Sequence, residues 1–315
     1  MSAFSKLVAP WYPATAVGLE KGIATMVHLE RGRGNTCNLR RAATISLDQS
    51  LIVPSFQELN IANQSELASA LRELGTGAGL LRQKRWSVAL PEATTRTLIL
   101  NLESQPGSAS ELEEILTWKI ERSFGVPVEE LTLSRERLPA DPQERDRYIV
   151  VAARTAVLEQ YENVFESLGW RTGLILPRHM GEAEWLTRNG AVGDSLLLSS
   201  FGEGFTAVVF RGKQPLIMRT IACEPHERED ELYRLLLFYR DRRLADSDEP
   251  GQYLSRLLVI GTGLSGKRAS EIVNETLTTF LRPLAAEDLG LRIPTADLSF
   301  DTIAAPAGLA TLSWR

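Results

Sequence analysis

Cysteine and histidine are scarce in this chain, which has two cysteines and three histidines among 315 residues. Cys37 and Cys223 are too few for the disulfide framework of a small secreted protein. Cys223 and His226 have ligand chemistry, but a structural zinc site needs four ligands and the sequence offers no second pair. The composition therefore excludes a disulfide scaffold and a zinc-stabilised fold.

Long hydrophobic runs and an excess of positive charge are also missing. The longest apolar runs, such as "SLLLSS" and "RLLVIG", are far shorter than the roughly 20 residues of a membrane-spanning helix. The start, "MSAFSKLVAPWYPATAV", has neither the apolar core nor the cleavage site of a signal peptide. The net charge of -5 argues against nucleic acid as the main partner. We therefore expect a cytoplasmic protein that binds no nucleic acid and does not insert into a membrane.

The residues that are present predict two halves that begin alike. Hydrophobic residues make up 43% of the chain and charged residues 24%, which is typical of a soluble protein with one large or two ordinary domains. "TAVGLE" and "IATMVHLERG" are separated by Lys21 and Gly22, which predicts a β-hairpin. About 180 residues later, "SLLLSS", "FTAVVF" and "PLIMRTI" are separated by the turn-like "FGEG" and "RGKQ" and predict a second hairpin group.

Helices and strands alternate between these two groups. Residues 65–74 predict a helix, and "WSVALP" and "RTLILNLE" predict strands. The clearest helix is "SASELEEILTWKIERSF", in which Ser110 as N-cap and Glu113 three residues later predict a capping box. Two further strands, "LTLSRERL" and "YIVVAA", follow it.

The stretch "RLLVIGTGLSGKRAS" is similar to a phosphate-binding loop. Residues 261–267 fit the first seven places of the pattern G-x-x-x-x-G-K-[ST], but Arg268 stands where the hydroxyl residue is needed. Such a loop normally opens its domain, whereas little of this chain remains after it. A strand that enters a helix through a glycine turn is the simpler interpretation.

Two other patterns suggest catalytic residues, but the sequence lacks the partner residues that each would need. Asp194 and Ser195 belong to "GDSL", a nucleophile block of one esterase family, but the base that must take the serine proton is missing. His179, in "PRHMGEAEW", has no residue at catalytic spacing, so we expect it in a loop that leads into a helix. We therefore assign no catalytic residue and no metal ligand.

The order of these elements is that of the actin-like fold, and the chain resembles the type IV pilus assembly protein PilM family from about residue 14 to the end. The most telling stretches are "WSVALPEATTRTLILNLES", "ELEEILTWKIERSFGVPVEELTLSRERL" and "RYIVVAARTAVLEQYENVFESLGWRTGLILPRHMGEAEWL". The resemblance implies an α/β, actin-like (ribonuclease H-like) two-domain fold with an inserted small subdomain. Domain I would be 1–180, with the insertion at about 86–160. Domain II would be 181–295, and 296–315 would return to domain I.

The resemblance also implies a degenerate nucleotide site with weakened magnesium binding, and it leaves open whether ATP still binds there. Two turns would face the phosphates and a third the adenosine, and their residues are Glu20, Gly22, Ser200, Gly202, Gly261, Thr262 and Gly263. The family pattern has Asp-x-Gly in each hairpin turn, where a carboxylate organises hydrated magnesium. Glu20 and Ser200 replace the two aspartates, and Ile23 takes the place of a small hydroxyl residue. We therefore expect no ATP hydrolysis.

By the same resemblance, the chain would be a cytoplasmic scaffold of a type IV pilus or a related secretion machine, peripheral to the inner membrane. Its partners would be the N-terminal cytoplasmic segment of a PilN-like inner-membrane protein and other pilus assembly components. The segment would lie in a groove beside the inserted subdomain, where Arg135 and Arg137 are the candidate contacts. The alternative is an actin-like ATPase or a sugar-kinase-like phosphotransferase, which the altered carboxylates of the two turns disfavour.

Overall fold

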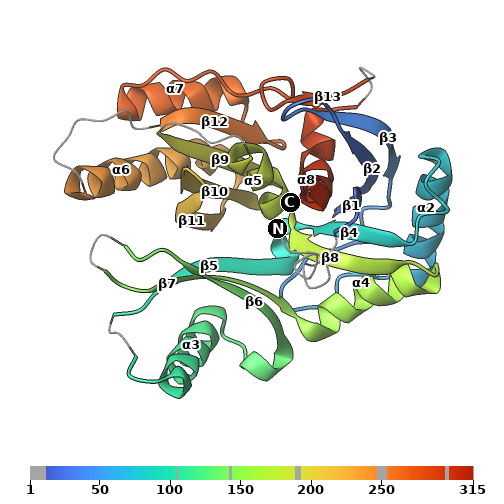
Figure 1. The fold of residues 1–315 in the computed structure, drawn as a ribbon, viewed down its shortest axis with the longest axis horizontal. Helices are drawn as coiled ribbons and strands as arrows, with labels where there is room; N and C mark the ends of the chain where they lie inside the picture. Colours follow the sequence, from blue (N-terminus) through green and yellow to red (C-terminus); the bar gives the residue numbers. More distant parts are fainter. Residues whose placement is uncertain are drawn as a thin grey trace.

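Three β-sheets organise the computed structural model, which describes residues 12–103, 106–141, 144–188, 193–246, 254–294 and 298–314 (Figure 1). The largest sheet contains β1 (Thr15–Glu20), β2 (Ile23–Arg31), β3 (Cys37–Ser46), β4 (Arg85–Leu90), β8 (Arg171–Pro177) and β13 (Leu291–Arg292). Its strand order is β13-β3-β2-β1-β4-β8. A four-stranded sheet has the order β11-β10-β9-β12 and contains β9 (Asp194–Phe201), β10 (Gly204–Arg211), β11 (Gln214–Ala222) and β12 (Leu254–Ile260).

The two larger sheets begin in the same way, as the sequence predicted. β1 and β2 pair antiparallel up to Glu20 and Ile23, and Gly22 in the two-residue turn has a φ of 78°. A turn of this kind favours glycine because φ is positive there. β9 and β10 also pair antiparallel, and each first strand then has a parallel neighbour, β4 or β12. Each half thus places a hairpin turn and a parallel strand side by side.

Helices cover both faces of these sheets. α2 (Gln64–Gly77) and α4 (Thr155–Ser167) share one apolar core with the six-stranded sheet. α6 (Arg228–Asp246) and α7 (Gly266–Leu277) share another with the four-stranded sheet. Among the described residues, no helix is long and apolar enough to cross a bilayer.

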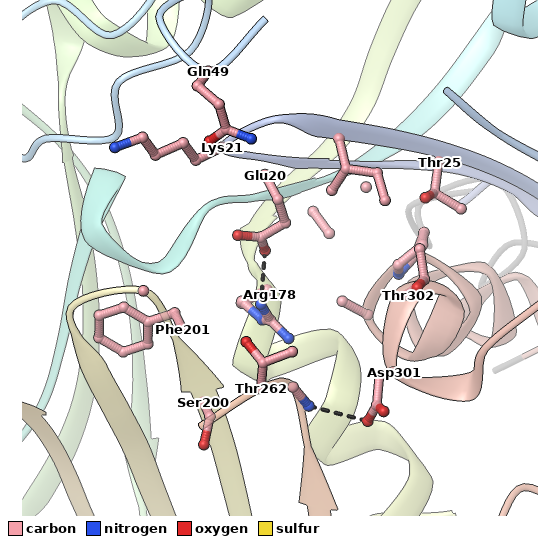
Figure 2. A pocket seen from close by; sticks show the side chains of 17 residues that line it. Glu20, Lys21, Thr25, Gln49, Arg178, Ser200, Phe201, Thr262, Asp301 and Thr302 are labelled. Atoms are coloured by element: carbon pink, nitrogen blue, oxygen red, sulfur yellow. Dashed lines mark hydrogen bonds and ion pairs between the residues drawn. The ribbon is translucent and has the colours of Figure 1, made fainter. Parts of the chain in front are cut away.

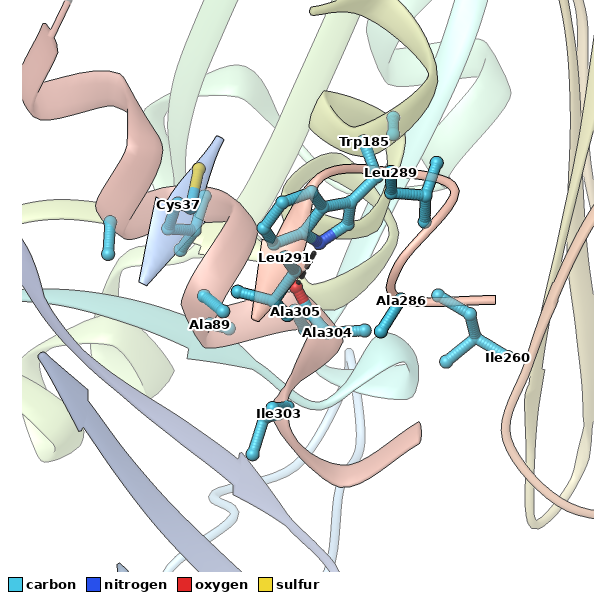
Figure 3. Packing of buried hydrophobic residues seen from close by; sticks show 14 of the residues in the cluster. Cys37, Ala89, Trp185, Ile260, Ala286, Leu289, Leu291, Ile303, Ala304 and Ala305 are labelled. Carbon is cyan, nitrogen blue, oxygen red and sulfur yellow. Dashed lines mark hydrogen bonds between the residues drawn. The ribbon is translucent and has the colours of Figure 1, made fainter. Parts of the chain in front are cut away.

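Between the two sheets lie α5 (Arg178–Thr187) and α8 (Phe300–Thr311), which carry the central core. Figure 3 shows how Trp185 packs there, with its indole Nε1 donating to the carbonyl of Ala304 at 2.8 Å. The two helices approach very closely, because a Cβ added at Gly181 would lie 2.2 Å from the carbonyl oxygen of Ala305. A Cβ added at Gly308 would likewise overlap the backbone carbonyl of Gly181. These glycines fix the position of α5.

A small sheet of order β5-β7-β6 forms a separate layer with α3 (Ala109–Phe124) and an apolar core of its own. Its strands are β5 (Thr95–Asn101), β6 (Leu131–Leu138) and β7 (Arg147–Arg154). This layer is narrower than the predicted 86–160, because β4 and α4 belong to the six-stranded sheet and its covering helices. β13 also pairs with β3, although the sequence placed these residues in the second domain.

The predicted cap of α3 is wrong by two residues. The helix begins at Ala109, and the hydroxyl of Ser108 accepts the amide of Glu111 at 3.1 Å. The Glu111 carboxylate accepts the amide of Gly107 at 2.6 Å. The sequence contains two overlapping Ser-x-x-Glu patterns, and the earlier one caps the helix.

We predict that Gly181→Ala lowers the free energy of unfolding by about 1–3 kcal/mol, because the new methyl group overlaps the backbone of α8. The matched control is Gly77→Ala at the exposed end of α2, where a Cβ would meet only another Cβ at 4.0 Å. That variant should be more stable by about 0.4–1 kcal/mol. Urea unfolding of both variants measures the difference, and an equal effect of the two substitutions would contradict the close approach.

Candidate functional site

A cavity of about 390 Å³ lies where the turns of both halves meet (Figure 2). Of the seven residues predicted for a nucleotide site, five line it: Glu20, Ser200, Gly202, Gly261 and Thr262. Gly22 and Gly263 belong to the same turns without lining the cavity. The structure also adds residues that the sequence did not suggest: Lys21, Gln49, Arg178, Asp301 and Thr302.

Arg178 is the central charged residue of this cavity. Its side chain is 9% exposed, and its Nη1 lies 3.0 Å from the Glu20 carboxylate. Its Nε and Nη2 donate to Glu182 Oε1 at 2.9 and 2.7 Å. Figure 2 shows the guanidinium between Glu20 on one side and Thr262 on the other. Burial raises the pKa of the Glu20 carboxyl to about 7, although the nearby Arg178 lowers it.

A second polar group joins α5 to both larger sheets. Glu92 follows β4 in a short 3₁₀ turn, and the Nδ1 of His179 donates to its two carboxylate oxygens at 2.7 and 2.9 Å. The hydroxyl of Thr206 on β10 donates to the same carboxylate at 2.5 Å. Burial raises the pKa of Glu92, but His179 and Thr206 outweigh it and lower the pKa overall. His179 is therefore a buried helix residue, not the loop residue that we expected.

Arg228 connects the two turns of the second half. Its Nη1 donates to the carbonyl of Thr262 at 2.7 Å, and its Nη2 donates to the carbonyls of Phe201 and Gly202 at 2.7 and 2.9 Å. Gly263 has a φ of 100°, and a Cβ there would overlap the guanidinium. Glycine is required at this position for both reasons.

The backbone amide of Gly261 is already bonded within the chain. It donates to Asp301 Oδ1, in the first turn of α8, at 3.0 Å. A Cβ at Gly261 would lie 2.2 Å from the carbonyl oxygen of Ser200, so the two turns are in close contact. This amide is therefore not free to bond a ligand.

These groups do not fit the hydrated magnesium ion that an actin-like nucleotide site implies. A guanidinium lies beside Glu20, and a second cation in the same place would be repelled. Ser200 has no charge, and Figure 2 shows its hydroxyl turned away from Glu20. Over the described ranges, no three His, Cys, Asp or Glu side chains form a group that could hold a metal.

The other sequence candidates lie outside this cavity or have structural partners. Asp194 accepts from Tyr239 at 2.8 Å, and the buried Ser195 hydroxyl has no hydrogen-bond partner in the structure, so neither forms a hydrolase triad. Arg268 bonds Glu229, and Lys267 is exposed. The likeness to a phosphate-binding loop is therefore accidental.

Arg135 and Arg137 extend from β6 and have different surroundings. Arg135 pairs with Glu113 of α3 at 2.6 Å, and Arg137 pairs with Asp146 at 2.6 Å. Of the two, Arg137 lines a groove of about 540 Å³ between the small sheet, α5 and the β10–β11 hairpin. Only Arg137 is therefore placed to meet a ligand in this groove.

Comparison with solved structures gives whole-length similarity. The PilM-PilN type IV pilus biogenesis complex matches with a TM-score of 0.75 at 18% identity, covering 97% of this chain and 100% of the other. A Bacteroides thetaiotaomicron protein with an actin-like ATPase fold and unknown function has a TM-score of 0.52 at 14% identity, with 99% of each chain covered. No protein-family model matches the chain, and no curated protein is similar to it in sequence.

At these identities the similarity shows the fold alone. The predicted α/β actin-like fold is confirmed, and the resemblance to the PilM family is confirmed at the level of the fold.

The raised pKa of Glu20 predicts a pH-dependent stability. Between its ordinary value of 4.5 and about 7, the folded chain holds a proton that the unfolded chain loses, so the free energy of unfolding falls as pH rises. Glu20→Gln keeps the neutral form at every pH. Relative to that of wild type, the free energy of unfolding of Glu20→Gln should therefore rise by about 1–2 kcal/mol between about pH 5 and pH 8.

Glu73→Gln on the exposed face of α2 is the control, because it makes the same substitution far from the cavity. Denaturant titrations across this pH range measure both differences. A constant difference between Glu20→Gln and wild type would show that the pKa of Glu20 is ordinary.

Proposed function

We propose that this chain is a cytoplasmic, actin-like scaffold of a type IV pilus or related secretion machine, peripheral to the inner membrane, with other assembly components among its partners. It binds the N-terminal cytoplasmic segment of a PilN-like membrane protein. The observation that carries the proposal is the similarity to the PilM-PilN complex over 97% of the chain, at a TM-score of 0.75. The groove and the cavity supply independent support.

The groove has the chemistry that a short peptide needs. Its walls are apolar and come from the small sheet, α5 and the β10–β11 hairpin: Leu138, Pro139, Ile149, Met180, Phe210, Pro215 and Met218. Four charged residues lie among them, namely Glu136, Arg137, Glu184 and Lys213. Methionine adapts to irregular apolar ligands, and charged residues around such a groove orient them.

Arg147 fixes the geometry of this groove. It is 4% exposed, and its Nη2 donates to the carbonyls of Pro215 and Leu216 at 3.0 and 3.4 Å. These carbonyls belong to β11, an edge strand of the four-stranded sheet. The small sheet and the second half are thereby joined on one side of the groove, which favours a preformed binding surface.

The cavity supports a scaffold over the alternative, an ATPase or a sugar-kinase-like phosphotransferase. Phosphoryl transfer depends on a placed metal ion and on free backbone amides near the phosphates. Here Arg178 lies beside Glu20, Asp301 accepts the amide of Gly261, and Ser200 supplies no charge. We infer that the nucleotide site is degenerate and that ATP is not turned over.

Arg135 and Arg137, both on β6, provide a matched pair of variants for testing where the peptide binds. Arg137→Glu should weaken binding of the N-terminal peptide of a PilN-like protein by about tenfold, because a charge that lines the groove is reversed. Arg135→Glu on the α3 side should change the affinity less than about twofold. Met218→Asp puts a charge into the apolar wall and should weaken binding whatever the charge of the peptide. Calorimetric titration measures all three, and wild-type affinity for all three would show that the peptide binds elsewhere.

For ATP turnover, we expect no phosphate release above background from purified protein with magnesium and ATP, because the cavity does not fit the metal. A phosphate-release assay tests this. A steady magnesium-dependent rate that Glu20→Ala abolishes would replace the scaffold with the ATPase.

A further inference from the structure

Arg178 lies where its positive charge can replace that of a bound ion. It is the first residue of α5, directly after β8, and its three side-chain nitrogens are all used. Its two carboxylate partners come from separate elements, because Glu20 ends β1 and Glu182 lies one turn further along α5. A single positive charge thus joins the first hairpin to the helix between the sheets.

We propose that Arg178 is a built-in replacement for a bound cation, which holds the first hairpin against α5 so that the cavity keeps its shape without a ligand. This inference goes beyond the proposed function, since it requires neither the peptide nor the absence of ATP turnover. It concerns only the positive charge that lies between the carboxylates of Glu20 and Glu182.

The carboxylates around Arg178 are those that a hard cation would otherwise attract. Glu182 is completely buried, and its Oε2 has no hydrogen-bond partner in the structure. An ionised carboxylate buried in this way needs a positive charge nearby. Magnesium and manganese take carboxylate oxygens as ligands, so the same pair could satisfy either an arginine or a divalent ion.

Two further polar contacts at the turns around the cavity are also made within the chain. Asp301 accepts the amide of Gly261, as a ligand oxygen would, and Arg228 binds the carbonyls of both turns of the second half. Arg228 differs from Arg178 in that it donates to backbone carbonyls, which carry no net charge. Arg228 therefore supplies a control at the turns beside the cavity.

The test is thermal unfolding of the full chain with and without millimolar magnesium or manganese chloride, without nucleotide, at about pH 8.5, which is above the wild-type Glu20 pKa of about 7. Arg178→Ala should lower the Tm by about 5–10 °C, because it leaves the buried Glu182 and the partly buried Glu20 without a counter-charge. The divalent salt should restore about half of that loss or more, and should shift the wild-type Tm by less than about 1 °C.

Two further variants separate a replaced cation from an ordinary structural ion pair. In the double variant Arg178→Ala with Glu20→Gln, divalent salt should not restore the Tm, because one of the two carboxylates has become a neutral amide. Arg228→Ala should also lose stability, but without recovery in divalent salt. A sodium chloride control at equal ionic strength accounts for general screening.

Some results would overturn the proposal. If Arg178→Ala folds and neither ion raises its Tm beyond the sodium control, the arginine is a structural partner only. If that variant does not fold, Arg178→Met, which keeps the apolar part of the side chain, takes its place with the same expected recovery. If wild type itself binds manganese and Glu20→Gln abolishes that binding, the site between the carboxylates accepts a metal beside the arginine and the proposal is wrong. Peptide affinity and phosphate release, measured separately, test the proposed function.

Discussion

The pairing of the buried Arg178 guanidinium with two carboxylates is the interaction on which the centre of the molecule depends. A buried charge is tolerated only with partners in good geometry, so Glu20 and α5 must be held in place. The close contact of Gly181 with α8 and the bond from Trp185 to Ala304 provide that position. Packing between two helices thus sets the electrostatics of the cavity.

α5 separates the cavity from the groove, and its residues divide between the two. Arg178, at the start of the helix, faces the carboxylates of the cavity, while Met180 and Thr187 line the groove. One rigid helix therefore forms a wall of both hollows. Because packing against α8 fixes the position of this helix, the same helix contact sets the geometry of both the cavity and the groove.

The sequence predicted the parts of this structure that follow from local patterns. Both hairpin groups, the helix at α2 and the glycine turn after β12 are where alternation and turn residues indicated. It could not predict which sheet β4 joins, because that depends on pairing with β1 some 70 residues away, and it could not choose between the overlapping caps of α3. Arg178 and Glu182 are spaced as an i,i+4 pair, and that spacing was the one available signal of the charged cluster. Their third partner, Glu20, is distant in sequence, which is why the cluster was missed.

The central claim is that Arg178, beside Glu20, takes the place of a magnesium ion in this actin-like fold. A nucleotide titration with and without magnesium tests this claim most directly. If Arg178 takes the place of the cation, magnesium leaves the affinity for ATP unchanged. A tightening of ATP binding by magnesium that Glu20→Gln removes would contradict the account.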